Sequence, residues 1–211
     1  MRVWKGPRAA RRLAHHSRSR PVEDAFVDAV HHHPRLALEM LKNDRSLALA
    51  RAGWGETALQ AACHLGQHEL IRGLISAGAK QDVFAACAAA DIEALNEFLQ
   101  DTDPTECGIH GLPLSHFAVV SGDTGTVQAL IDAGIEMNPA GASLSPLHTA
   151  VAIGSIPMIK ALMATGVDIG VSDAFGATAL DWAYDVEDRG SVLAVLLAAG
   201  LRRPAAERRS A

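Results

Sequence analysis

The stretch Ser145–Ala150 reads SPLHTA, which is the composition of a helix start. Serine can accept hydrogen bonds from the backbone N–H groups of the first turn, and proline has the φ angle that the first helical residue needs. Gly154 then ends this helix, and apolar residues at helical spacing fill 156–163 before Gly166. The segment therefore predicts two short helices joined by a tight turn.

Glycines recur along the chain at similar offsets. Gly134 and Gly166 are 32 residues apart, and Gly166 and Gly200 are 34 apart. Further glycines precede three such boundaries by twelve residues, at Gly66, Gly122 and Gly154. A pair of short helices cannot bury its own apolar side chains, so stacked neighbouring pairs must complete the core. The spacing therefore predicts a solenoid of repeated helix pairs.

The stretch 145–150 resembles the ankyrin-repeat signature Thr-Pro-Leu-His-x-Ala with one conservative change, and residues 57–62 and 178–183 match it more loosely. The resemblance implies an all-α ankyrin-repeat solenoid of about six helix-turn-helix repeats, some degenerate, with short hairpin loops. We place the repeats at 21–51, 52–80, 81–106, 107–139, 140–172 and 173–203. A basic head at 1–20, which we expect to be disordered, and a short tail at 204–211 flank them.

Two repeats depart from this pattern. The third, at 81–106, follows Gly78 too closely to include a hairpin, so the row of hairpins should be interrupted there. The sixth carries one extra residue around 186–190, which predicts an irregular junction between its helices.

Charge divides the chain into three parts. Residues 1–20 hold seven Arg or Lys and no acid, residues 21–201 hold eight against 23 Asp or Glu, and the tail is basic. A body with a net charge of −15 repels nucleic-acid phosphates and attracts basic partners. The head resembles a transit peptide or a nucleic-acid arm, and a start site placed upstream of the true one explains it equally simply.

The composition indicates which cellular compartment and which kind of organism we expect for this protein. No apolar run approaches the roughly 18 residues of a transmembrane helix. Cys63, Cys87 and Cys107 lack metal-site spacing and cannot pair completely, which favours a reducing, cytoplasmic compartment. We expect the first two to be buried in inner helices and the third to lie in a loop. Fifteen arginines against four lysines, with abundant alanine, indicate a GC-rich and bacterial genome.

The histidines do not predict chemistry. Residues 31–33 are consecutive histidines that would point about 100° apart on a helix, so we interpret them as a solvated turn before Pro34. Gly66 should separate His64 from His68 and prevent a shared metal face. We therefore expect no catalytic residue, no metal, no cofactor and no small-molecule substrate.

Ankyrin proteins bind partners on the hairpin tips and the exposed side of the inner helices, and the resemblance implies such a face here. The positions carried over are Trp54, Glu56, His64, Leu65, Ile109, His110, Leu112, Leu144, Ile153, Phe175 and Asp185. Trp54 and Phe175 are the expected anchors, because aromatic side chains often dominate interface energy. The alternative is that they pack hairpin against hairpin. The resemblance also implies that His116 and His148 hydrogen-bond within and between repeats.

Two acidic clusters offer a second kind of surface. One runs through residues 91–106, and the other consists of Asp181, Asp185 and Asp188, which would share a face if their helix continues. Each is either a solvated surface or a landing site for a basic segment.

These features predict a non-catalytic module that binds another protein, one with a basic patch, on its concave face. One alternative is an adaptor whose basic head contacts nucleic acid or a membrane surface. Another is an effector secreted into a host cell, which the resemblance permits.

Overall fold

The computed structural model describes residues 21–103, 106–138, 144–173 and 175–202, so the basic head and the tail lie outside the described residues. Within these ranges the chain forms six consecutive helix pairs. The first helices are α1 (Pro21–His32), α3 (Ala58–His64), α5 (Val83–Ala88), α7 (Leu114–Val120), α9 (Pro146–Ile153) and α11 (Ala179–Trp182). The second helices are α2 (Pro34–Asn43), α4 (His68–Ser76), α6 (Ile92–Leu99), α8 (Thr124–Asp132), α10 (Ile156–Ala164) and α12 (Arg189–Ala198).

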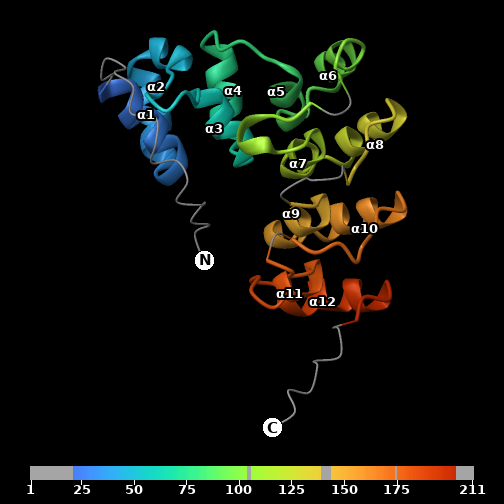
Figure 1. Ribbon diagram of the computed structural model, residues 1–211. Coiled ribbons are helices and arrows are strands. Elements are labelled where there is room, and N and C mark those ends of the chain that lie inside the picture. The colour runs from blue at the N-terminus through green and yellow to red at the C-terminus, as the bar shows by residue number, and fades with distance from the viewer. Residues whose placement is uncertain (1–20, 104–105, 139–143, 174, 203–211) are drawn as a thin grey trace.

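The helix pairs stack along an arc (Figure 1). The first three pairs run across the top of the view and the last three descend from them. The first helix of each pair lies toward the concave side, and we call these the inner helices. No β-strand occurs among the described residues, which confirms the expected all-α solenoid.

The predicted helix starts are made by side-chain caps. Ser145 accepts a hydrogen bond from the backbone N–H of His148, and Gly154 ends α9 in the left-handed conformation at φ 74°. The looser signature copies use a capping box instead, in which Thr57 and Thr178 each exchange hydrogen bonds with the residue three places on. Capped ends allow helices as short as the four residues of α11 to begin and end at defined positions.

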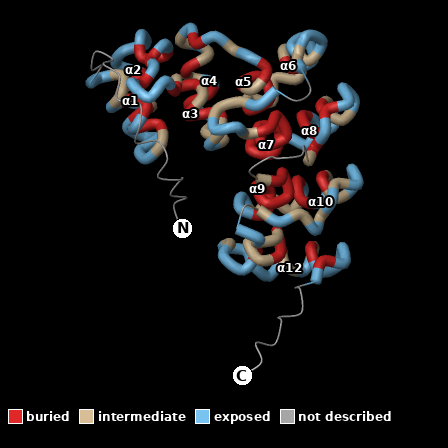
Figure 2. Tube along the Cα trace, viewed as in Figure 1, coloured by how far each residue is buried: buried red, intermediate tan, exposed pale blue. Residues whose placement is uncertain are grey.

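The core lies in the contacts between helices (Figure 2). The inner helices contribute small residues, including the fully buried Ala58, Ala61 and Ala62 of α3, which allow neighbouring helices to pack closely. The outer helices contribute larger side chains such as Leu70 and Leu74 of α4. Burying each of these leucines contributes about 1.5–3 kcal/mol, so the stacked pairs stabilise one another.

Among the described residues, three hairpin loops, which we call fingers, project before α3, α7 and α11. Isolated β-bridges close them at Arg51–Thr57, Cys107–Pro113 and Ser172–Thr178. No such bridge lies between α4 and α5, where six residues, 77–82, connect the helices. The third repeat therefore lacks a finger, as its sequence predicts.

The fourth repeat contacts the second repeat directly, past the fingerless third. His116 of α7 donates a hydrogen bond from Nε2 to the carbonyl oxygen of His64 at the end of α3, 3.0 Å away. Gly66 lies so close to α7 that a Cβ there would be 2.9 Å from the carbonyl oxygen of Val120. A pocket of about 610 Å³ lies between the finger before α3 and the finger before α7, and its lining includes Arg51 and Lys80.

The sixth repeat has the irregular junction that its extra residue predicts. The helix α11 ends after four residues, and turns lead to α12. The condition for a shared acidic face of Asp181, Asp185 and Asp188 is not met, because the helix does not continue. Asp181 instead belongs to the capping box of α11, and Asp188 accepts a hydrogen bond from Ser191 N–H to begin α12.

The helices are short throughout the described part of the chain. None has the length and apolarity that crossing a lipid bilayer requires.

Candidate functional site on the inner face

The candidate partner-binding residues are spread along the fingers and inner helices. The structure leaves one group exposed: Trp54, Leu65, His110, Ile153, Phe175 and Asp185. A second group is partly buried: His64, Ile109, Leu112 and Leu144. Glu56 is buried, with 3% of its surface exposed, so its carboxylate is not available at the surface.

The tips of the three fingers carry equivalent residues. Trp54, His110 and Phe175 each precede a glycine with positive φ. Phe175 is 88% exposed and Trp54 is 57% exposed. His110 itself has a φ of 60°, a conformation that few residues other than glycine adopt. The fingers thus present three ring side chains on the concave side.

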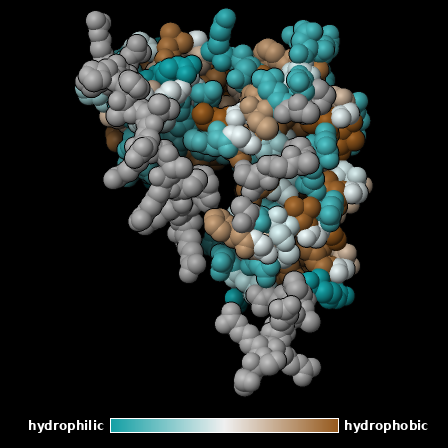
Figure 3. Space-filling model, in the orientation of Figure 1, coloured by the Kyte–Doolittle hydropathy of each residue, from teal (hydrophilic) through white to brown (hydrophobic). Residues whose placement is uncertain are grey.

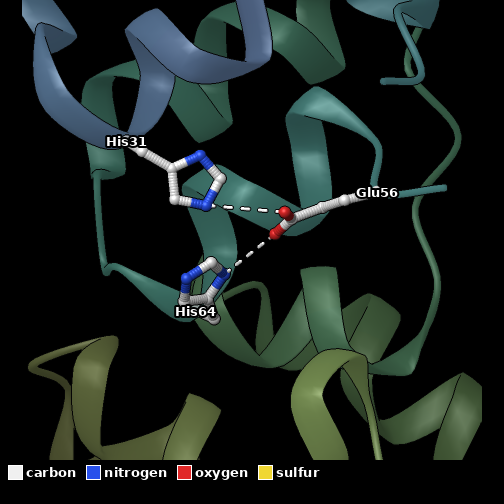
Figure 4. A group of neighbouring side chains, drawn as sticks. All are labelled: His31, Glu56 and His64. Carbon is white, nitrogen blue, oxygen red and sulfur yellow. Dashed lines mark ion pairs between the residues drawn. The ribbon is translucent and has the colours of Figure 1, made fainter. Parts of the chain in front are cut away.

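Glu56 is the centre of a histidine cluster that connects three repeats, and Figure 4 shows its contacts with His31 and His64. Its Oε2 lies 3.5 Å from Nε2 of His31, which comes from the last turn of α1. Its Oε1 lies 3.5 Å from Nδ1 of His64, at the end of α3, and 3.5 Å from Nε2 of His110, in the finger before α7. We call His31, Glu56, His64 and His110 the inner-face cluster.

Surrounding groups orient this cluster. The Nδ1 of His31 lies 2.9 Å from the carbonyl oxygen of Val27 and must carry a hydrogen, so Nε2 faces Glu56. Trp54 donates its indole N–H to Oε2 of Glu56 at 3.0 Å. Oε1 of Glu56 is buried and accepts no hydrogen bond from any described residue. An unsatisfied buried carboxylate oxygen is costly, and here it faces two imidazole nitrogens.

The cluster perturbs its own protonation. Burial opposes ionisation of Glu56, but hydrogen bonds from His31 and Trp54 and the charges of His31 and His64 outweigh it and lower the pKa to about 2. The hydrogen bond to Glu56 raises the pKa of His31 despite its burial. Burial lowers the pKa of His64 to about 4. At neutral pH Glu56 is therefore ionised, and His64 is neutral.

The cluster has the donors of a metal site. One nitrogen of His31, one oxygen of Glu56 and one nitrogen of His64 lie within 4.8 Å of one another. Imidazole nitrogen and carboxylate oxygen are ordinary ligands of zinc and related ions.

The interpretation of residues 31–33 as a solvated turn was wrong for His31. Helix α1 continues to His32, and this turns the His31 side chain inward to 20% exposure while His32 stays exposed. A periodic signal was present, because His31 and His64 are 33 residues apart, one ankyrin period. Both lie in the last turn of consecutive inner helices. Nothing in the sequence indicated that Glu56 would turn between them.

The signature histidines have the structural role that the resemblance implies. His148 hydrogen-bonds within its repeat to Ser145 Oγ at 2.7 Å and to the next finger at the Ala177 carbonyl oxygen, 2.9 Å away. His116 pairs with Thr149 Oγ1 at 3.1 Å, in addition to its contact with the second repeat. These side chains connect repeats.

The cysteines are placed as expected. Cys63 and Cys87 are buried in α3 and α5, and burial raises the pKa of both thiols. Cys107 is exposed at the base of a finger. His68 lies beyond Gly66, at the start of α4, so the glycine separates it from His64 as expected.

Other surfaces lie away from the inner face. The acidic residues Glu93 and Glu97 are exposed on the outer helix α6. A shallow apolar hollow between α10 and α12 includes Met163 and Val195 in its lining. Hydrophobic side chains gather along this side of the descending pairs in Figure 3.

Comparison with known families agrees with this architecture. A model of ankyrin repeats in three copies matches residues 83–173 and 115–202, and a model of the single ankyrin repeat matches 54–97. These matches span most of the chain, and the protein belongs to the ankyrin-repeat family. No curated protein matches the chain. Ankyrin repeats are generally protein–protein interaction modules, and the proteins that contain them are typically non-catalytic scaffolds.

Proposed function

We propose that the protein is a non-catalytic module that binds a partner protein on the fingers and inner helices of its concave side. The observation that supports this most directly is the row of exposed apolar side chains there: Trp54, Leu65, Ile153 and Phe175. These residues belong to the second, fifth and sixth repeats. One exposed apolar side chain is ordinary on a soluble protein, but such a row is typical of an interaction surface.

The scaffold suits this role because it is preorganised. Phe175 stands on a finger whose backbone is held by Asp173, which accepts hydrogen bonds from the N–H groups of Phe175 and Ala177 at 2.8 and 2.9 Å. A finger fixed before binding loses little further conformational entropy when a partner docks.

Charge supports a basic partner. Residues 21–201 carry a net charge of −15, so their field attracts cations over distances of about 8–10 Å at physiological salt. The partner would therefore associate faster at low ionic strength.

The two buried cysteines supply no activated nucleophile in this proposal. Cys63 and Cys87 are buried with raised pKa values, so neither is a reactive thiolate at neutral pH.

The proposal is tested by affinity capture with the full chain as bait, followed by measured binding of the captured protein. Phe175→Ala is the test variant. Phe98→Ala is the matched control, because Phe98 is also exposed but lies on the outer helix α6. We expect Phe175→Ala to weaken binding by about thirtyfold, since truncating an anchor typically costs about 2 kcal/mol or more.

Phe98→Ala should bind like the unaltered chain. Equal loss in both variants, or loss in neither, would contradict a partner face on the concave side. An association rate that does not change with salt would contradict the electrostatic part of the proposal alone.

A further inference from the structure

We propose that the inner-face cluster binds one transition-metal ion of the zinc type, which joins the first, second and fourth repeats. Its ligands would be His31, Glu56, His64 and His110. The site lies beside Trp54 of the proposed partner-binding surface, but the metal proposal does not depend on partner binding.

The distances in the cluster suit such an ion. Zinc holds imidazole nitrogen and carboxylate oxygen at about 2.0–2.2 Å, so neighbouring ligand atoms of a tetrahedral site are about 3.3–3.6 Å apart. Oε1 of Glu56 lies 3.5 Å from Nδ1 of His64 and 3.5 Å from Nε2 of His110, and Oε2 lies 3.5 Å from Nε2 of His31. One ligand atom from each of His31, Glu56 and His64 lies within 4.8 Å of the others, and His110, which contacts Glu56, would complete the ligand set by moving toward this group.

The outer contacts are those that ligands require. His31 directs Nδ1 to the Val27 carbonyl oxygen at 2.9 Å, which fixes its ring and leaves Nε2 for the ion. Trp54 holds Oε2 of Glu56 at 3.0 Å, which leaves Oε1 for the ion. Metal-binding histidines and carboxylates are usually held by such hydrogen bonds.

The buried oxygen is the second, independent observation. Glu56 is only 3% exposed, and its Oε1 is inaccessible to solvent. This oxygen accepts no hydrogen bond from the described residues. A metal ion would satisfy it. At His64, Nδ1 also lies 3.1 Å from the Gln60 carbonyl oxygen, so coordination would replace that contact.

The donors identify the class of ion and its role. Three imidazoles and one carboxylate suit zinc, nickel or copper, whereas calcium and magnesium prefer oxygen ligands throughout. Four protein ligands leave no open position, which is the arrangement of structural zinc sites. The ion would therefore clamp α1 and the finger before α7 onto the second repeat.

The test is a calorimetric titration of Zn²⁺ into the full, untagged chain after chelator treatment. The visible spectrum of the Co²⁺ form reports geometry and ligand type. We expect one ion per chain, a tetrahedral Co²⁺ spectrum and no thiolate charge-transfer band. His31→Gln and His64→Gln should each weaken affinity about a hundredfold or more, since even an outer partner typically contributes 10–100-fold.

His32→Gln is the matched control, because His32 is adjacent to His31 but exposed. It should leave affinity unchanged. His110→Gln changes an exposed finger tip, so it tests the site even if the other variants fold poorly, and we expect at least a tenfold loss.

Absence of stoichiometric binding, or binding that survives His110→Gln and His64→Gln, would overturn the proposal. So would a thiolate band, which would place the ion on a cysteine. Any of these results leaves the partner-binding proposal standing, because that proposal is tested separately with Phe175→Ala, and the test can be repeated with a chelator present.

Discussion

The imidazole of His116 hydrogen-bonds to the carbonyl oxygen of His64, 52 residues earlier in the chain and two repeats away. That carbonyl lies in the last turn of α3, where the helix offers no N–H partner of its own. The signature histidine of the fourth repeat therefore caps a helix of the second repeat. Because the third repeat has no finger, α7 of the fourth repeat can contact α3 of the second repeat directly.

Replacing His116 with leucine should lower the free energy of unfolding by about 1–3 kcal/mol, because a buried acceptor loses its partner. Urea unfolding followed by circular dichroism measures this. Thr149→Val is the control, since it removes the other partner of His116 and keeps the bond to His64. An equal cost for both variants would show that the bond to His64 contributes nothing.

Gly66 and Gly122 form a matched pair for testing the close packing of the second and fourth repeats. Both have positive φ, 65° and 71°, but only Gly66 has a neighbour, Val120, in the way of a Cβ. Gly122→Ala should cost about 1 kcal/mol from backbone strain alone. Gly66→Ala should cost clearly more in the same unfolding measurement. Similar costs would mean that α7 can move away without penalty.

The repeat lattice and the caps could be predicted from sequence because they depend on neighbouring residues. Ser145 and Gly154 define the ends of α9 wherever the helix is placed. The inner-face cluster could not be predicted from the sequence. It depends on how far the finger that carries His110 extends past the third repeat, which has no finger, toward Glu56. Whether a helix would continue through Asp185 stayed open in the sequence for a related reason, and in the structure a local cap at Asp188 begins a new helix.

Two proposed anchors should differ in their effect on stability. Phe175 is 88% exposed, so Phe175→Ala should change the free energy of unfolding by less than about 0.5 kcal/mol. Trp54→Ala should cost about 1 kcal/mol or more, because Glu56 loses the indole hydrogen bond. Thermal unfolding of both variants checks this. A destabilised Phe175→Ala would indicate that Phe175 packs within the array.

Asp173 should give the last finger a pH-dependent stability. Burial opposes its ionisation, but hydrogen bonds from Ala177, Phe175 and Trp182 lower its pKa below the ordinary value. A lowered folded-state pKa contributes stability that is present above about pH 4, the unfolded value, and is lost as the pH falls through the folded value.

Asp173→Asn should therefore destabilise the chain by roughly 1 kcal/mol at pH 7, a modest figure because solvent screens the carboxylate. The difference from the unaltered chain should shrink as unfolding is measured from pH 5 downward. A difference that is constant with pH would contradict the role of the charge.

Thiol labelling should distinguish the cysteines. A disulfide reagent at pH 8 should modify Cys107 rapidly in the folded chain, because it is exposed. Cys63 and Cys87 should react only on unfolding, since burial both blocks access and raises their pKa values. Cys107→Ser provides the control, and rapid labelling that survives this change would contradict the assignment.

The missing finger also changes how the array should fold. In a linear repeat protein each unit is stabilised by its two neighbours, and cooperativity spreads one interface at a time. Contacts from α7 to α3 add a coupling between units that are not adjacent. The second, third and fourth repeats then form or melt together, as a single cooperative block from which the remaining repeats extend. The second and fourth repeats thereby hold the degenerate third repeat between them. The repeat whose sequence departs most from the ankyrin pattern therefore need not be the first to unfold.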